Sequence, residues 1–182
     1  MTKMEPRIYG YHCNEKSNII SFKDGDYSKA KDVTDIEWLG HGIYFWDNQS
    51  NAIYWKKKKK NNRKNKDKEF DIMQVMLSLE RLLDLTDLDD IDFCLEVLKD
   101  LEKKGVKVRN PKYPGKTLNY LFHETQIFEE YHILKSCGIY KKHLKPQFFK
   151  PIKGSPHLTT RVKMMYCVKN EECIYKDTAI IL

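Results

Sequence analysis

The sequence predicts an α+β domain, and three observations carry this prediction. Residues 70–79 and 158–168 alternate apolar and polar positions and are rich in β-branched residues or methionine, which is typical of half-buried strands. Residues 88–104 instead repeat their apolar positions at helical spacing, at Ile91, Leu95 and Leu98. The chain has 182 residues, a length that favours one domain with its own core. We therefore expect a single domain over residues 1–182.

The other elements are expected from local signals in chain order. A capping pattern at Thr86 and Asp89 starts the helix over 88–104, and Gly105 ends it. Asp47 or Asn48 can cap another helix. The remaining expected strands cover 7–12, 43–45 and 174–182, the remaining helices cover 15–22, 51–55 and 117–137, and exposed loops cover 23–35 and 145–156.

The charge of the chain is uneven. The formal net charge is +7, and the low-complexity segment Lys56–Lys68 holds most of the excess. We expect this segment to be a flexible loop. Its charge favours an anionic partner such as nucleic acid, a nucleotide or an acidic protein, although a merely solvated basic loop would look the same.

Cysteine usage and hydropathy indicate a reduced, cytoplasmic protein without a membrane segment. The five cysteines form no Cys-x-x-Cys pair, and the first seven residues are too polar for a secretion signal. No segment has the roughly 18 apolar residues that cross a bilayer. The histidines His123, His132, His143 and His157 lack metal-ligand spacing, so no metal is expected.

Two stretches carry a pattern of functional interest. The first is Tyr11-His12-Cys13 at the end of the first expected strand. The second is residues 38–46, Trp-Leu-Gly-His-Gly-Ile-Tyr-Phe-Trp, followed by Ala-Ile-Tyr at 52–54. Taken alone, a Tyr-His pair at a strand end is usually structural, and the glycine-rich string could be a strand entering the core. Together and in this order, they resemble the diphtheria-toxin-like and poly(ADP-ribose)-polymerase-like branch of the ADP-ribosyltransferases.

This resemblance implies a fold and a ligand. The fold is a split β-sandwich of two small antiparallel sheets around an NAD cleft, with flanking helices, and NAD is a substrate. His12 is expected to hydrogen-bond the ribose, the backbone of Cys13 to hold the carboxamide, and Tyr44 and Tyr54 to stack on the cationic nicotinamide ring. Tyr11, Gly42 and Phe45 complete the expected cofactor-binding set.

One feature of the family is missing. A late strand usually supplies a glutamate that contacts a ribose hydroxyl, but 158–168 contains no carboxylate, and the aligned positions are Arg161, Lys163 or Met165. Growth of poly(ADP-ribose) chains is therefore not expected. Transfer of one ADP-ribose unit remains possible, with Gln147 as the candidate that replaces the glutamate. His12, Tyr44 and Gln147 are the expected catalytic residues.

The resemblance extends to bacterial toxin-type transferases, which include an RNA-modifying phage-defence toxin with its own antitoxin. It implies a mono-ADP-ribosyltransferase that acts as a toxin or defence effector and can have an antitoxin or chaperone as partner. The basic charge favours RNA or another nucleic acid as acceptor. The alternatives are transfer to protein, hydrolysis of NAD, and an NAD-binding module that has lost catalysis.

Overall fold

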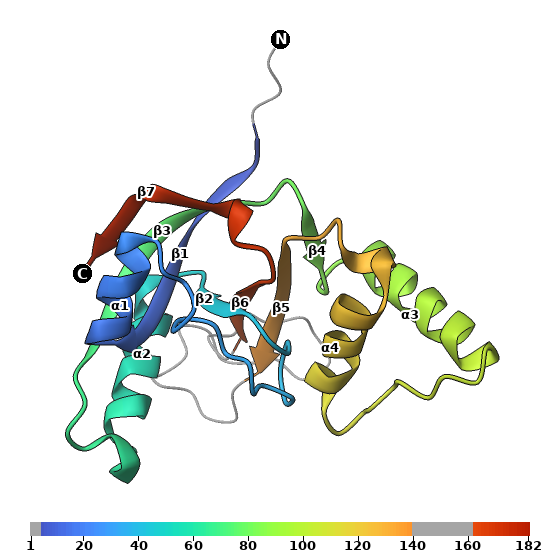
Figure 1. The fold of residues 1–182 in the computed structure, drawn as a ribbon, viewed down its shortest axis with the longest axis horizontal. Coiled ribbons are helices and arrows are strands. Elements are labelled where there is room, and N and C mark those ends of the chain that lie inside the picture. The colour runs from blue at the N-terminus through green and yellow to red at the C-terminus, as the bar shows by residue number, and fades with distance from the viewer. Residues whose placement is uncertain (1–4, 140–161) are drawn as a thin grey trace, which may run out of the picture.

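A computed structural model describes residues 5–139 and 162–182 (Figure 1). Its strands are β1 (Arg7–Glu15), β2 (Ile43–Trp46), β3 (Phe70–Ser78), β4 (Leu82–Asp84), β5 (Ile133–Ile139), β6 (Val162–Val168) and β7 (Ile174–Ile181). The α-helices are α1 (Lys16–Asp24), α2 (Gln49–Lys60), α3 (Leu88–Lys103) and α4 (Pro114–Glu124). Short 3-10 helices cover Arg63–Asn65, Gln126–Phe128 and Glu171–Cys173. The described chain therefore combines helices with a β-sheet, which is compatible with the α+β prediction.

The described strands form one hydrogen-bonded sheet in the order β4-β5-β6-β2-β1-β3-β7, antiparallel except for the β4–β5 pair. The two separate sheets that the sequence predicted are therefore joined, and this expectation is corrected. The joint is narrow, because β1 and β2 share a single register pair, Tyr11 with Trp46, whereas β1 pairs with β3 along its whole length. Strands β1 and β2 thus share the fewest register pairs of any neighbouring strands in the sheet.

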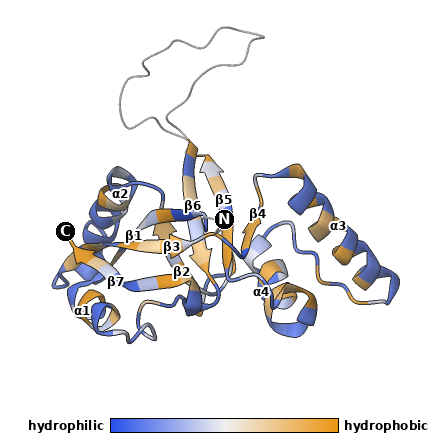
Figure 2. Ribbon diagram, turned by 90° about the horizontal axis from the view of Figure 1, so that it is seen from above, coloured by the Kyte–Doolittle hydropathy of each residue, from blue (hydrophilic) through white to orange (hydrophobic). Residues whose placement is uncertain are grey.

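Helices cover both faces of the sheet at the β1 end. Helix α1 buries Ile19 and Phe22 in one core cluster, while α2 buries Ala52 in a second cluster that also contains Cys13. Figure 2 shows these two helices on opposite sides of β1 and β3, and α3 and α4 together at the β4–β5 end. Because successive residues of a strand point to opposite faces, β1 directs His12 towards α1 and Cys13 towards α2.

Side-chain caps and a glycine set the helix boundaries. The side-chain oxygen Oδ1 of Asn48 accepts a hydrogen bond from the Asn51 backbone amide at 2.9 Å, as the cap prediction for α2 required. The Asp87 carboxylate caps α3 by accepting from the Asp89 amide. Gly105, in the left-handed region at φ 82°, follows the end of α3 as predicted.

The predicted long helix over 117–137 is wrong. Helix α4 ends at Glu124, and β5 begins at Ile133, with Ile133 and Leu134 fully buried between β4 and β6. The apolar spacing of this region fits a helix and a strand equally well, and pairing with β4 and β6 decides between them. Strand β4 was also missed, since three residues are too few to show a pattern.

The lysine-rich segment is not a loop throughout. Lys56–Lys60 form the C-terminal part of α2, and Arg63–Asn65 form a 3-10 turn, so the loop prediction is wrong for these residues. This part of α2 is held against the sheet by the ion pair of Lys56 with Asp71 on β3 and by the hydrogen bond from Lys59 to the Cys13 carbonyl oxygen on β1. All five cysteines are free thiols. No helix in the described parts of the chain is long and apolar enough to cross a membrane.

Candidate functional site

A pocket of about 410 Å³ opens where β1 and β2 separate. Both strands contribute to its wall, as do the segment 29–38, helix α2 and strand β6. Its aromatic side chains include Trp38 and Trp55, which are 43% and 36% exposed. The residues used below are lining residues of this pocket: His12, Cys13, Asp32, Asp35, Trp38, Tyr44, Trp46, Trp55, Lys59 and Met165. This size suits a nucleotide-like ligand.

His12 occupies the gap between the two strands. Its Nδ1 lies 2.8 Å from the carbonyl oxygen of Tyr44, so Nδ1 carries the proton and donates to that oxygen. The ring packs against Phe22 and Phe45. Burial lowers the pKa of His12 from 6.5 to about 4. The ring is therefore neutral near pH 7, and its Nε2 is a buried acceptor without a partner among the described residues.

Tyr44 is held by the segment that precedes it. Its hydroxyl donates to the Asp35 carboxylate and lies 2.8 Å from the carbonyl oxygen of Gly40, and it accepts from the Leu39 amide at 3.0 Å. The Asp35 carboxylate also accepts from the Gly40 amide at 2.8 Å. Burial raises the pKa of the Tyr44 phenol, which stays protonated. The hydroxyl thus already has hydrogen-bond partners within the protein, and the ring is the part of Tyr44 that is available to a ligand.

Cys13 presents its backbone to the pocket side of β1. The ammonium group of Lys59 donates to the Cys13 carbonyl oxygen at 3.1 Å. Because the N–H and C=O of one strand residue point to the same edge, the Cys13 amide faces this side too. Burial raises the pKa of the Cys13 thiol, so it is a neutral, unreactive side chain near pH 7.

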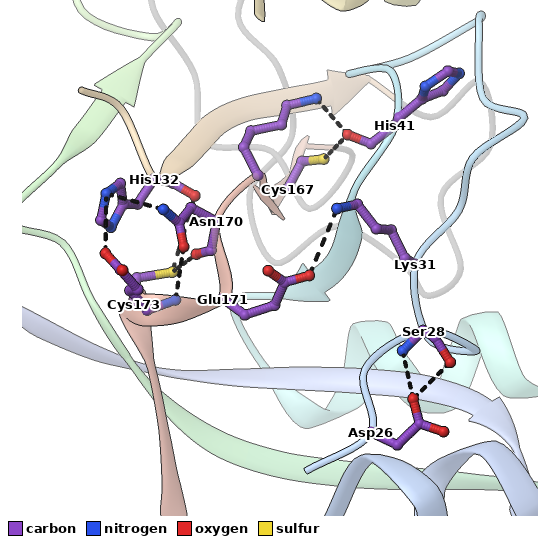
Figure 3. A network of polar contacts seen from close by, with 11 residues as sticks. Asp26, Ser28, Lys31, His41, His132, Cys167, Asn170, Glu171 and Cys173 are labelled. Carbon is purple, nitrogen blue, oxygen red and sulfur yellow. Dashed lines mark hydrogen bonds and ion pairs between the residues drawn. The ribbon is translucent and has the colours of Figure 1, made fainter. Parts of the chain in front are cut away.

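Contacts with the end of β6 and with the turn after it hold the segment 26–42 that frames the pocket. Figure 3 shows the ion pair between Lys31 and Glu171, at 3.6 Å, and the contact of the Cys167 thiol with the His41 carbonyl oxygen. The Lys169 ammonium donates to the carbonyl oxygens of Leu39 and His41 at 2.6 and 2.7 Å. These contacts position Asp35 and Trp38 on the pocket wall.

Gly42 serves this same segment and not the pocket. It has φ 155°, and a Cβ atom there would lie 2.4 Å from Cys167 Sγ and 2.6 Å from the Val168 carbonyl oxygen. Its amide and carbonyl form a bridge with Asp32, at 2.8 Å in both directions. A side chain is therefore excluded by the close approach of β6.

The structure brings together three of the predicted site residues and places others elsewhere. His12, Cys13 and Tyr44 line the pocket. Phe45 is fully buried in the core beside His12, and Tyr11 packs against the cluster on the opposite face. Tyr54 is not among the lining residues, and its ring centre lies 5.5 Å from the Lys163 ammonium. Gln147 lies outside the described residues.

The late strand contributes no carboxylate to the pocket. Of the three aligned positions, Met165 lines the pocket, and Lys163 is buried and donates to the Asn51 side-chain oxygen at 2.5 Å. Arg161 lies outside the described residues. The carboxylates that reach the pocket are instead Asp32 and Asp35, from the segment that the sequence predicted as a polar loop.

Sequence reasoning missed most of the lining residues, among them Asp35, Trp38, Trp55 and Lys59. The signal for Trp55 was present, since it follows Tyr54 on a predicted helix, where only Tyr54 was selected. Lys59 was hidden among five consecutive lysines. Asp35 could not be identified from the sequence, because its contacts with Tyr44 and Gly40 depend on how the segment folds back.

Comparison with known proteins gives one match to a curated protein. An uncharacterized protein of Methanocaldococcus jannaschii is 28% identical over 156 residues, which cover 78% of this chain and 73% of that protein. No protein-family model matches the chain, and no solved structure matches it.

Proposed function

We propose that the chain is a mono-ADP-ribosyltransferase that uses NAD as the donor of ADP-ribose. One observation carries the proposal. His12, Cys13 and Tyr44, which the resemblance selected from two distant stretches of sequence, line one pocket in the gap between β1 and β2. A binding site requires that residues with suited chemistry lie together at one cavity, and these three residues do.

The chemistry of these residues suits the nicotinamide riboside half of NAD. Nε2 of His12 is buried and has no partner among the described residues. It can accept a hydrogen bond from a ribose hydroxyl if the entering ligand displaces the atoms that cover it, and this would remove the cost of about 1–3 kcal/mol of leaving a buried acceptor unpaired. The ring of Tyr44 offers a flat face to a cationic pyridinium. The Cys13 amide and carbonyl can serve a carboxamide, provided that Lys59 releases the carbonyl oxygen.

Transfer requires cleavage of the bond between nicotinamide and ribose, through a state with positive charge on the sugar. Such a reaction depends on positioning and on nearby negative charge. Asp35 is the carboxylate that contacts the Tyr44 hydroxyl and faces the pocket, so it can supply this charge in place of the late-strand glutamate. Gln147, which the sequence offered in place of that glutamate, remains a second candidate for this role.

The proposed acceptor is RNA or another nucleic acid, approaching over the basic C-terminal part of α2. Lys56 is not available for this, because it pairs with Asp71 at 3.1 Å, and Lys59 points into the pocket. Lys57 and Lys60 are exposed. Replacing both by glutamine should lower RNA modification and its salt dependence while NAD affinity stays unchanged. Unchanged RNA modification would remove α2 from the acceptor site. Action as a toxin-type effector with an antitoxin belongs to the same proposal.

Site variants test the enzyme assignment. With NAD labelled in the adenylate phosphate and a whole-cell lysate as acceptor, Tyr44→Ala and His12→Asn should each abolish transfer of label. Tyr9→Ala is the matched control, because Tyr9 is an exposed tyrosine on β1 outside the pocket lining, and it should transfer label normally. Full transfer by both site variants would refute the assignment of the pocket.

A second candidate is an NAD-binding module that no longer catalyses transfer. Met165 on the pocket wall and the buried Lys163 ammonium, at positions where the family carries a carboxylate, favour it. Calorimetric titration with NAD, followed by measurement of released nicotinamide, separates the two candidates. Binding without release in every lysate fraction supports the module, and release supports the enzyme.

A further inference from the structure

Lys59 differs in its contacts from the neighbouring lysines of α2. Lys56 is neutralised by Asp71, and Lys57 and Lys60 are exposed. Lys59 lies along the inner side of the helix, partly buried, and its ammonium group reaches the pocket edge of β1 at the Cys13 carbonyl oxygen. A flexible, hydrated side chain is seldom placed at the wall of a cavity without a partner for its charge.

The charge of Lys59 lacks a counter-ion within residues 5–139 and 162–182. No carboxylate there forms an ion pair with it, although Asp32 and Glu15 lie near enough to favour its charged form. The partners of the ammonium group among the described residues, the Cys13 carbonyl oxygen and the Phe70 ring 5.9 Å away, are both neutral, and an ammonium group has three donors. Burial lowers the pKa of Lys59, which reflects this incomplete compensation. An anionic group bound in the pocket would compensate the charge of Lys59.

We propose that Lys59 binds the phosphate of a nucleotide that occupies this pocket. The aromatic wall selects a nucleotide over a simple anion, because Trp38 and Trp55 expose ring surface on which a base can stack. In an NAD-using enzyme the phosphate is one of the pyrophosphate groups, and this part of the inference rests on the proposed function. Recognition of a nucleotide phosphate by Lys59 does not depend on the proposed function.

Phosphate binding also explains how the Cys13 carbonyl becomes available. The four-carbon stem of a lysine allows its ammonium group to move between neighbouring acceptors. When a phosphate enters, the ammonium group transfers its hydrogen bond from the Cys13 carbonyl to a phosphate oxygen, which forms the stronger, charge-assisted bond. The freed carbonyl then accepts from the ligand. The pocket therefore favours phosphorylated ligands over the corresponding nucleosides.

Calorimetric titration of the full chain with ADP-ribose, ADP and adenosine tests this inference. Lys59→Met should bind ADP-ribose and ADP about tenfold more weakly than wild type, as expected for loss of a charged hydrogen bond. Its affinity for adenosine should not change. Lys59→Arg should restore much of the phosphate-dependent affinity, which confirms that charge and not packing is responsible. Lys56→Met removes a lysine of the same helix outside the pocket lining and should bind all three ligands like wild type.

The outcomes separate this inference from the proposed function. Equal binding of ADP-ribose by wild type and Lys59→Met, or an equal loss for adenosine, overturns the role of Lys59. Wild-type protein that binds none of the phosphorylated ligands overturns it as well. Wild-type protein that binds ADP-ribose and depends on Lys59, yet neither binds NAD nor releases nicotinamide from it, leaves Lys59 as a phosphate-binding residue and refutes the transferase.

Discussion

Replacing His12 should remove a pH dependence of stability that the wild-type protein shows in mild acid. The ring is 5% exposed, donates through Nδ1 to the Tyr44 carbonyl and packs on Phe22 and Phe45. Burial lowers its pKa from 6.5 to about 4. Between these values the unfolded chain binds a proton at this position and the folded chain does not. The free energy of unfolding must therefore fall as the pH falls from about 6.5 to about 4.

The size of this effect follows from the two pKa values. One pKa unit corresponds to about 1.36 kcal/mol, so the step from 6.5 to about 4 corresponds to roughly 3 kcal/mol. This is a large part of the free energy of unfolding of a typical domain, which is roughly 5–15 kcal/mol. His12→Asn retains a donor near the position of Nδ1 and does not titrate. His12→Phe fills the ring volume and also does not titrate.

Urea denaturation of the three proteins between pH 8 and pH 4.5 measures the effect. Both variants are expected to be less stable than wild type at pH 8, since they lose ring packing or the bond to Tyr44. Their stability should fall less than that of wild type towards pH 4.5, so that the curves converge. Parallel curves for all three proteins would show that His12 is not buried in its neutral form and would refute the account of the site.

The other predictions concern the segment that frames the pocket. Gly42→Ala should lower the free energy of unfolding by about 2 kcal/mol or more, because the new Cβ would lie 2.4 Å from Cys167 Sγ; a melting temperature equal to that of wild type would contradict the close approach of β6. Lys169→Met should leave the Leu39 carbonyl unpaired and the His41 carbonyl with only the weak contact of the Cys167 thiol. The loss should cost about 1–3 kcal/mol and accelerate proteolytic cleavage within residues 26–42, and an unchanged cleavage pattern would argue against this anchor. Tyr44→Phe removes the contact with Asp35 and should cost about 1 kcal/mol of stability, but it should still bind NAD. Tyr44→Ala should lose stability and NAD binding. An NAD affinity that falls equally in the two variants would show that the hydroxyl, and not the ring, binds NAD.

The parts of the site that could be predicted from the sequence are those with a local signal. His12 and Cys13 lie on a strand with clear β character, and Tyr44 belongs to a short string bounded by glycine. Strand geometry then determines which edge and face these residues use. Their meeting at one pocket required only that β1 and β2 be neighbours, which the resemblance implied.

The parts that could not be predicted depend on long-range pairing. Asn119 accepts from the His41 amide at 2.6 Å and donates to the Asp35 carbonyl at 3.1 Å, and these contacts join residues about 80 positions apart. Ile133 was assigned to a helix because its spacing fits one, and only β4 and β6 as partners show that it belongs to a strand. Lys59 is one of five consecutive lysines, and its orientation is determined by how α2 packs on β1.

A crystal structure of the protein with a non-hydrolysable NAD analogue would show whether NAD binds in the gap between β1 and β2. We expect the nicotinamide ring against the face of Tyr44, the carboxamide on the backbone of Cys13, and the Lys59 ammonium moved from the Cys13 carbonyl to a phosphate oxygen. The ribose should place a hydroxyl at Nε2 of His12. An analogue bound with its nicotinamide outside the gap between β1 and β2, with the contact of Lys59 to Cys13 intact, would contradict the proposed site.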